Sequence, residues 1–528
     1  MVRLVHELIE RAALRAPDSL ALRDRGRSYT YADLLALCGQ YAALFQACSH
    51  ERHARVAVWM EKRVEVVGAL FGACRAGCVM VPVNPLLKPE QVAHIVSDCQ
   101  VRVLLTTPER YALLREVMSV CNELRDIVLV GPGDAEEVTP GGPRLIRFEQ
   151  WEGLPAPCRS IDADMAAILY TSGSTGKPKG VVLSHRNIVA GAQSVAEYLE
   201  LGSADRILSV LPLSFDYGLN QLTTAFLSGA CVVLLNYLLP RDVVRAVADE
   251  RITGLAAVPP LWIQLASQEW PQQARQCLRY LTNSGGHMPG PVLEALQGRL
   301  PQTKPYLMYG LTEAFRSTYL PPDELARRPD SIGKAIPNAE ILVVREDGTE
   351  CEPWEPGELV HRGVHVAMGY WGDSERTAER FRPAPTQSHG LMIPEMAVWS
   401  GDTVKKDDEG FLYFVGRRDE MIKTSGYRVS PSEVEEVAYG AAVAGEVAAL
   451  GVTHPVLGQA VVVVAYGVTG MDAMAVEAAI IAECRQRLPA FMVPAKVLLH
   501  ENPLPRNPNG KIDRKSLADR YHQVFGQA

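Results

Sequence analysis

The stretch YTSGSTGKPKG at residues 170–180 sets Lys177 and Lys179 among small, flexible and hydroxylated residues. Glycine lets backbone N–H groups approach an anion closely, and Ser and Thr hydroxyls donate further hydrogen bonds. It is not a Walker loop, GxxxxGK[ST], because two residues separate Gly173 from Gly176 and Pro178 stands where that loop carries a hydroxyl. These residues alone leave two interpretations, a phosphate-binding loop of another kind or a flexible linker.

The residues on either side of this loop favour the first interpretation. MAAILY (165–170) precedes it and GVVLS (180–184) follows it, and both short apolar runs predict strands. A loop between two buried strands is the tip of a hairpin rather than an interdomain linker.

Four later stretches are also richer in glycine and polar residues than a hydrophobic core requires. They are SGGHMP (284–289), YGLTE (309–313), SGDTVKKDDEGFLYFVGRRDEMIKTSGYR (400–428) and NPNGK (507–511).

The elements that position these stretches follow a βαβ pattern. Residues 1–50 predict amphipathic helices around one strand pair, and later strands alternate with helical stretches, which predicts parallel sheets in two subdomains of about 160–200 residues each. The strands are predicted at 56–60, 79–83, 101–107, 207–213, 231–236, 252–260 and 280–286.

The last third of the chain changes character twice. From residue 330 onward, alternating strands and glycines predict a smaller β-rich unit, and after GRRDE (416–420) a compact α+β unit begins. We therefore predict an α/β protein with a large N-terminal domain (1–417), a small C-terminal domain (418–528) and a hinge near Arg418–Glu420.

Composition excludes several classes of function. The 528 residues carry a net charge of −8, which argues against nucleic acid or an anionic membrane as the main partner. No apolar run approaches the ~18 residues that a membrane-spanning helix needs. The eleven cysteines are scattered without disulfide or metal-site spacing, so we expect reduced thiols, a packing role for Cys74 and Cys78, and a cytoplasmic location.

Taken together and in order, the loop at 170–180 and the four later stretches resemble the motif series of the adenylate-forming enzymes. This superfamily comprises acyl- and aryl-CoA synthetases, adenylation domains of peptide synthetases, and luciferases. The resemblance runs from about Tyr29 to Arg514, and it implies two steps. A carboxylic acid first attacks the α-phosphorus of ATP to give an acyl-adenylate and pyrophosphate, and a thiol then takes the acyl group and releases AMP.

The resemblance also implies roles for individual residues. Tyr309, with Gly310 after it, would stack on adenine, and Gly285 and Gly286 would let the base approach the backbone. Thr312 would donate to the α-phosphate, and Glu313 offers a hard oxygen ligand for Mg²⁺. Asp402 and Arg417 would bind the ribose, although Arg417 could equally serve a structural ion pair. The phosphate loop comprises Thr171, Ser172, Gly173, Ser174, Thr175, Gly176 and Lys179.

The small domain would serve both steps. Lys511 would neutralise the α-phosphate and the incoming carboxylate, and Asp419 aligns with the hinge about which the small domain rotates. Ser425, Gly426 and Tyr427 would then line the thiol tunnel. The acceptor would be CoA or the phosphopantetheine of a separate carrier protein.

The chain departs from many acyl-CoA synthetases at LPLSFDYGLN (211–220), where Phe215 replaces a histidine and Asp216 follows. The SFD triplet resembles peptide-synthetase adenylation domains, in which the aspartate pairs with the substrate ammonium. Because a buried aspartate is costly unless it is paired, Asp216 either binds an amine on a small carboxylic acid substrate or faces solvent or a backbone cap. Trp262 either caps the acyl cavity or packs against the sheet.

The leading interpretation is therefore an AMP-forming acid–thiol ligase. The alternatives are a stand-alone aminoacyl adenylation enzyme that loads a carrier protein and, from another class, a nucleotide-binding protein without turnover. Lys511 and Glu313 argue against the last, because nucleotide binding alone would not need Lys511.

Overall fold

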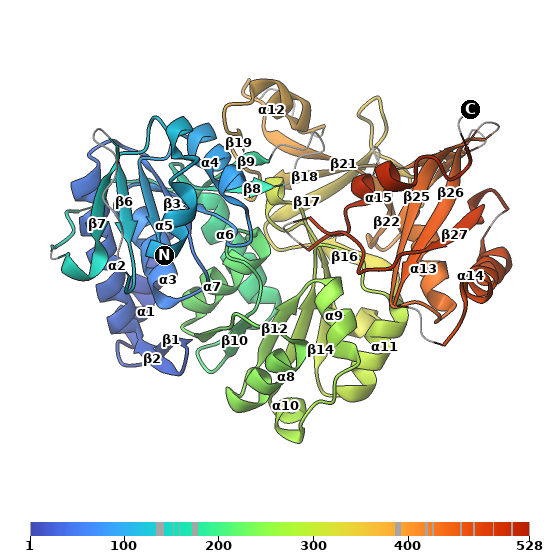
Figure 1. The fold of residues 1–528 in the computed structure, drawn as a ribbon, viewed down its shortest axis with the longest axis horizontal. Coiled ribbons are helices and arrows are strands. Elements are labelled where there is room, and N and C mark those ends of the chain that lie inside the picture. The colour runs from blue at the N-terminus through green and yellow to red at the C-terminus, as the bar shows by residue number, and fades with distance from the viewer. Residues whose placement is uncertain are drawn as a thin grey trace.

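The fold is built around three β-sheets (Figure 1). The computed structural model describes residues 2–133, 142–151, 153–157, 159–171, 178–385, 392–417, 421–424, 427–454, 457–467, 470–488, 490–507 and 510–526.

The first sheet has eight strands in the order β19-β9-β8-β4-β3-β5-β6-β7, and the strands from β4 to β7 run parallel. Strands β8 and β9 are antiparallel, with Thr171 opposite Lys179, so the predicted hairpin is confirmed. The strands are β3 (Arg55–Trp59), β4 (Val79–Pro82), β5 (Val103–Thr106), β6 (Asp126–Leu129), β7 (Arg144–Arg147), β8 (Met165–Thr171), β9 (Lys179–Ser184) and β19 (Gly369–Tyr370), with helices α3 (Val64–Arg75), α4 (Pro89–Asp98) and α5 (Pro108–Leu114) between them.

The second sheet has fourteen strands, and its parallel part runs β14-β13-β12-β10-β11-β1. Its first half comprises β1 (Leu20–Asp24), β2 (Arg27–Thr30), β10 (Arg206–Ser209), β11 (Cys231–Leu234), β12 (Gly254–Ala257), β13 (Tyr280–Asn283) and β14 (Lys304–Tyr309). Its second half comprises β15 (Thr318–Leu320), β16 (Ser331–Ala335), β17 (Ala339–Val344), β18 (Gly357–Gly363), β20 (Phe381–Pro383), β21 (Met396–Lys406) and β22 (Leu412–Arg417).

Helices cover both of these sheets. They are α1 (Glu7–Arg15), α2 (Tyr31–Cys48), α6 (His185–Tyr198), α7 (Asp216–Ser228), α8 (Pro240–Asp249), α9 (Pro259–Ala266), α10 (Gln272–Cys277), α11 (Gly290–Arg299) and α12 (Ser374–Arg380).

The predicted β-rich unit lies within the large part of the chain and is continuous with the second sheet. Strand β16 pairs with both β15 and β22, so the antiparallel strands extend the second parallel sheet without a break. The predicted strands at 207–213, 252–260 and 280–286 are also shorter than expected. They end at Ser209, Ala257 and Asn283. Proline, which follows the first two, lacks the N–H of a ladder, and the glycines that follow the third weaken a strand.

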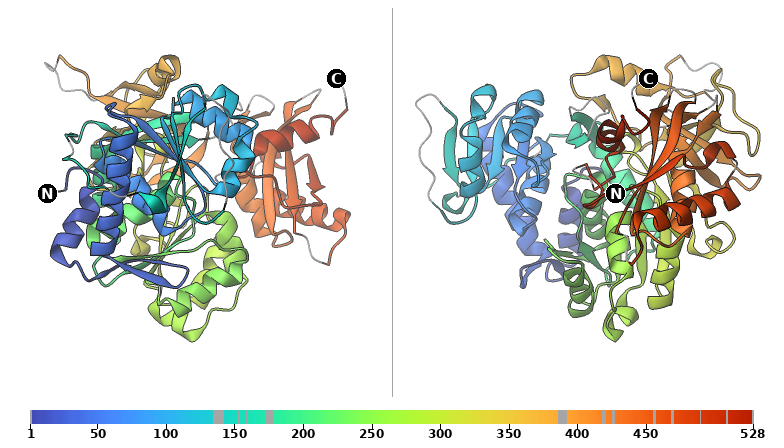
Figure 2. Two further views of the ribbon diagram at one scale, coloured as in Figure 1. Left: turned by 60° about the vertical axis from the view of Figure 1, so that its left-hand side comes forward. Right: turned by 45° about the vertical axis from the view of Figure 1, so that its right-hand side comes forward.

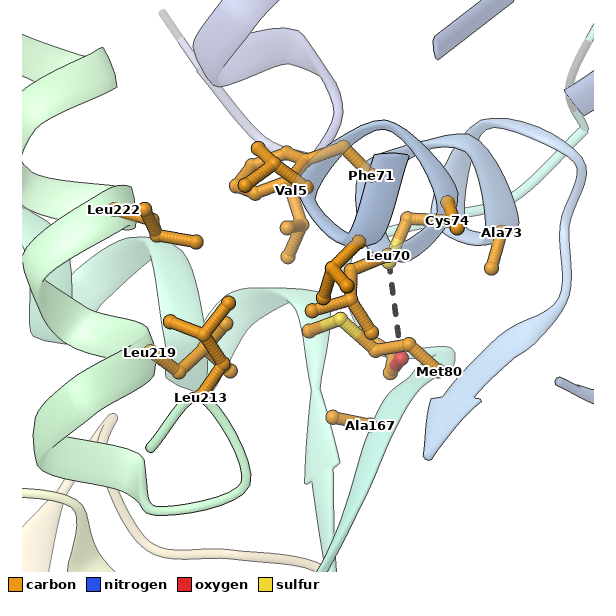
Figure 3. Packing of buried hydrophobic residues seen from close by; sticks show 14 of the residues in the cluster. Val5, Leu70, Phe71, Ala73, Cys74, Met80, Ala167, Leu213, Leu219 and Leu222 are labelled. Atoms are coloured by element: carbon orange, nitrogen blue, oxygen red, sulfur yellow. Dashed lines mark hydrogen bonds between the residues drawn. The ribbon is translucent and has the colours of Figure 1, made fainter. Parts of the chain in front are cut away.

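The two large sheets are joined by helices that share one core. Leu70 and Phe71 of α3 face Leu219 and Leu222 of α7 across this joint (Figure 3). Cys74 and Cys78 are buried, and the Cys74 thiol donates to the Ala166 carbonyl at 3.7 Å, so their predicted packing role is confirmed.

The C-terminal part has its own sheet and core and lies to one side of the large part (Figures 1 and 2). The predicted two-part α/β fold class is therefore confirmed, whereas residues 418–420 lie outside the described part of the chain and the hinge stays a prediction. Across the described ranges, no helix is both long and apolar enough to cross a bilayer. The elements are β23 (Ile422–Thr424), β24 (Tyr427–Val429), β25 (Glu446–His454), β26 (Gly458–Tyr466), β27 (Lys496–Leu499), α13 (Pro431–Gly440), α14 (Ala473–Arg487) and α15 (Arg514–Tyr521).

Candidate active site

Several of the predicted site residues lie at or just beyond the carboxyl ends of the parallel strands in the second sheet. Ligands of open α/β sheets bind at such an edge. Strand β13 leads into Gly285 and Gly286, β14 ends at Tyr309, and the chain after β10 leads into helix α7. Buried polar atoms without a hydrogen-bond partner occur at several places among the described residues, and those at this edge are candidate partners for a bound ligand. They are Ser209 Oγ, Ser214 Oγ, Asn220 Oδ1, Asn283 Oδ1, Arg316 Nε and Arg316 Nη2.

Tyr309, Asp402 and Arg417 lie together, as the resemblance implied. The Tyr309 hydroxyl donates to the Asp402 carboxylate, and Arg417 Nε lies 3.6 Å from Asp402 Oδ1. Asp402 and Arg417 are also register partners on β21 and β22. Burial raises the pKa of Asp402, and Arg417 opposes this. The cluster offers an aromatic ring, a carboxylate and a guanidinium within reach of one ligand.

Glu313 lies in a second cluster with Lys179 and Tyr370. Lys179 Nζ is 3.1 Å from Glu313 Oε1, and the Tyr370 hydroxyl donates to the same oxygen at 2.6 Å. Burial favours the neutral acid, but Lys179, Tyr370 and Arg380 together hold the pKa of Glu313 below its usual range. Glu313 is therefore a carboxylate, the hard donor that Mg²⁺ prefers, and one carboxylate with phosphate oxygens is a usual set for this ion.

Asp216 is the first residue of α7, and its side chain is buried. Thr312 Oγ1 donates to Asp216 Oδ1 at 3.3 Å. Burial raises the pKa of Asp216, and the positive charges of Arg316 and Lys511 oppose this rise. Two cations of the chain itself therefore lie near enough to Asp216 to stabilise its charge. The alternatives derived from sequence were a substrate amine, solvent or a backbone cap, and they did not include this one.

Lys511 reaches this edge from the small domain. Its Cε lies 3.8 Å from the point that a Cβ on Gly285 would occupy, and Gly510 packs in the same way against Val258 at the end of β12. Gly510 has φ +82°, and the Asn507 side chain accepts from the Lys511 N–H at 3.0 Å, which fixes the ends of this loop. The lysine side chain itself is exposed.

The two aromatic candidates for the acyl pocket differ in their surroundings. The Phe215 ring lies 3.6 Å from the Cβ position of Gly285, beside the Lys511 stem. Trp262 is fully buried, and its indole N–H donates to the carbonyls of Ala257 at 3.1 Å and Thr282 at 3.2 Å. Packing against the sheet therefore accounts for the burial of Trp262, and its role as a cap of the acyl cavity stays a prediction.

Several predicted residues lie outside the described part of the chain. Thr171 is described at the end of β8, and its Oγ1 is buried without a hydrogen-bond partner there. The undescribed residues are Ser172, Gly173, Ser174, Thr175, Gly176, Asp419, Ser425 and Gly426, and of Tyr427 only the backbone is described.

Sequence reasoning missed Tyr370, Arg380 and Arg316. Tyr370 and Arg380 meet Glu313 only through long-range packing of β19 and α12, so no local pattern marked them. Arg316 lies three residues after the YGLTE motif, and a positive charge so close to that motif is the sequence signal that could have identified it as a candidate site residue.

Two family models match this chain. The family model described as AMP-binding enzyme matches residues 9–371, and the one described as AMP-binding enzyme C-terminal domain matches residues 433–511.

Two relatives and one solved structure show the range of similarity. A long-chain-fatty-acid–CoA ligase of Salmonella typhimurium is 29% identical and covers 97% of this chain and 94% of its own length. An L-proline–[L-prolyl-carrier protein] ligase of Streptomyces coelicolor is 33% identical over 92% of this chain and 91% of its own. The o-succinylbenzoate CoA synthetase of Bacillus subtilis, solved with its acyl-adenylate intermediate, superposes with a TM-score of 0.80 at 25% identity and covers 97% of both chains.

Proposed function

The chain belongs to the AMP-binding enzyme family, and from this premise we propose that it is an AMP-forming acid–thiol ligase with CoA as the preferred acceptor. It joins a carboxylic acid to ATP as an acyl-adenylate and then transfers the acyl group to the thiol. The observation that carries the proposal is the meeting of Lys511 from the small domain with the strand ends of the large domain, beside the Tyr309–Asp402–Arg417 cluster.

In the first step, a carboxylate oxygen of the acid forms a bond to the α-phosphorus of ATP, and the bond from that phosphorus to pyrophosphate breaks. Phosphoryl transfer needs positioning and charge stabilisation more than covalent help. Lys511 would neutralise the approaching carboxylate and the α-phosphate. The Thr312 hydroxyl, whose one proton is donated to Asp216 in this structure, would turn from Asp216 to donate to the same phosphate. Tyr309 would hold adenine while Asp402 and Arg417 hold the ribose.

Glu313 fits a Mg²⁺ ligand because its neighbours keep it ionised. The ion, when bound, would neutralise charge on the phosphates. Lys179 contacts Glu313 and is the first residue of β9, in the hairpin that carries the proposed phosphate loop. It would therefore link the bound phosphates to the proposed metal ligand Glu313.

In the second step, the thiol sulfur forms a bond to the acyl carbon, the bond from that carbon to AMP breaks, and the thiol proton is lost. We assign the thiol path to Ser425, Gly426 and Tyr427, which requires the small domain (418–528) to turn about Asp419. A cytoplasmic location is part of the same proposal, and cell fractionation would test it.

The alternative function is a stand-alone adenylation enzyme that loads an aminoacyl group on a separate carrier protein. The buried carboxylate of Asp216 favours it, because a substrate ammonium would pair with this group. The nearby charges of Arg316 and Lys511 weaken that argument, since they already oppose the cost of burying Asp216.

The test is exchange of labelled pyrophosphate into ATP with a panel of acids, each supplied with and without an α-amino group. Exchange that depends on an acid, followed by thioester formation with CoA, is the expected result. Tight ATP binding without exchange for any acid would favour a nucleotide-binding protein and contradict the ligase. Thioester formation on a carrier protein but not on CoA would select the alternative.

A further inference from the structure

Arg316 is a buried cation whose hydrogen-bonding capacity is only partly used. Its side chain is 2% exposed, and Nη1 donates to Ser284 Oγ at 2.7 Å. Nε and Nη2 are buried without a hydrogen-bond partner among the described residues. Because a guanidinium stays charged at physiological pH, leaving two of its nitrogens without acceptors in a buried site is costly.

The backbone turn and the packing around Phe315 fix the position of Arg316. Phe315, directly before it, has φ 60° and ψ −72°, the rare and strained conformation of a γ-turn. The Phe315 ring packs over Gly191 of α6, where a Cβ would lie only 2.3 Å from the ring. This turn lays the Arg316 stem over Gly310 and its guanidinium 4.6 Å from the centre of the Tyr217 ring. Strain held by such close packing is typical of functional sites.

Arg316 shares its surroundings with the reacting end of the proposed substrate site. Ser284 directly precedes Gly285, over which Lys511 lies, and Tyr217 follows Asp216 on α7. Asp216 and Arg316 attract one another, yet among the described residues no carboxylate oxygen lies within 4.0 Å of the Arg316 nitrogens. Asp216 therefore lowers the cost of the buried charge without accepting the two remaining N–H groups.

The identity of the unused nitrogens indicates what they bind. Nε and Nη2 lie on one edge of the planar guanidinium, and this edge forms two parallel hydrogen bonds with a carboxylate. We propose that Arg316 binds a second carboxylate of the substrate, remote from the one that is adenylated, so that the preferred substrates are short dicarboxylic acids. This inference rests on the proposed ligase function and names its substrate class. Asp216 remains available for an amino group on the same acid.

The experiment compares kcat/KM for pyrophosphate exchange within matched pairs. Each dicarboxylic acid of three to six carbons is paired with the methyl-ended acid of equal chain length, with and without an α-amino group. The wild type should favour the dicarboxylic member on the order of 10²–10³-fold, because the methyl-ended acid leaves the buried Arg316 unpaired. This measurement needs no variant.

Three variants separate recognition from structure. Arg316→Met keeps a stem of similar size without the charge, and it should lower the preference to about one while exchange with methyl-ended acids persists. Arg316→Lys keeps the charge but cannot form two parallel hydrogen bonds with a carboxylate. Its preference for dicarboxylic acids should therefore lie between those of the wild type and Arg316→Met. The matched control is Arg328→Met, since Arg328 is also buried, stacks 3.9 Å over Phe411 and already pairs with Asp407 at 3.2 Å. It should leave the preference unchanged.

The outcomes distinguish the two proposals. Exchange with several acids, but with the methyl-ended members preferred by the wild type, would overturn the role of Arg316 and leave the ligase standing. A preference that Arg316→Met leaves intact would also overturn it. No exchange with any acid would remove the ligase proposal and this inference together. If Arg316→Met does not fold, the proposal is judged on two results: the preference of the wild type for dicarboxylic acids and the reduction of that preference in Arg316→Lys.

Discussion

Replacing Lys511 with alanine should divide the two half-reactions. The Lys511 stem lies 3.8 Å from the Cβ position of Gly285, at the edge where the α-phosphate and the carboxylate are proposed to meet. A unit charge about 4 Å from another is worth about 4 kcal/mol at an effective dielectric constant of about 20. In water the same pair is worth only about 1 kcal/mol, so the exposed lysine approaches the larger value only when bound substrate excludes water. Loss of one preorganised group that stabilises transition-state charge costs about 3–4 kcal/mol, or on the order of 10²–10³ in rate.

The assay measures each step separately. Adenylation is followed by pyrophosphate exchange, and transfer by thioester formation from a supplied acyl-adenylate and CoA. Lys511→Ala should slow the first on the order of 10²–10³-fold and leave the second close to the wild-type rate.

The control for this variant is Lys496→Ala, which removes an exposed lysine from β27 of the same domain and should slow neither step. Equal losses in both steps for Lys511→Ala would refute the reasoning, since the lysine would then act through the structure of the small domain. A loss below about threefold in adenylation would refute it as well.

Three further predictions concern substrate charge, rotation and pH. Asp216→Asn should weaken kcat/KM for amino acids while sparing or improving it for the deaminated analogues, because only the ammonium needs the carboxylate. Asp419→Pro fixes φ and should slow whichever half-reaction needs the orientation that becomes unreachable. Burial and Asp330 raise the pKa of Glu436, on α13 of the small domain, from 4.5 to about 7, and His287 Nε2 of the large domain lies 3.9 Å away. Through Glu436 the docked state binds more protons than the undocked state between these values, so this residue makes docking weaken as pH rises from about 4.5 to about 7. Burial lowers the pKa of His287, which acts in the opposite direction, so the Glu436 contribution is the difference between the pH profiles of the wild type and Glu436→Gln.

Each of these predictions has a result that would contradict it. An unchanged ratio of amino acid to plain acid in Asp216→Asn makes Asp216 structural. Wild-type rates for both steps in Asp419→Pro exclude a hinge there. Energy transfer between dyes on the two domains follows docking, and a pH profile that Glu436→Gln leaves unaltered would exclude Glu436 as its cause.

Much of this protein could be predicted from sequence because the relevant signals are local. Apolar β-branched runs separated by helical periods predicted the parallel strands, and the apolar flanks of residues 170–180 predicted the hairpin of β8 and β9. The resemblance of local motifs to those of the adenylate-forming enzymes likewise indicated Tyr309, Asp402 and Arg417, and the structure brings these three together.

Other features follow from pairings between distant segments, which local periodicity does not report. The sequence could not show that β16 joins β15 to β22 and merges the β-rich unit with the second sheet, because strand propensity does not name a partner. It also could not show that Tyr370 would meet Glu313.

The surroundings of Arg316 were decided by tertiary structure in the same way. A lone arginine in sequence is an ordinary surface cation. The strained turn at Phe315, the space above Gly191 and the Ser284 hydroxyl bury Arg316 near Asp216, and two of its nitrogens find no acceptor among the described residues. Sequence alone determined which chemical groups are present, and the packing of the chain decided which of them face one another and which are buried without a partner among the described residues.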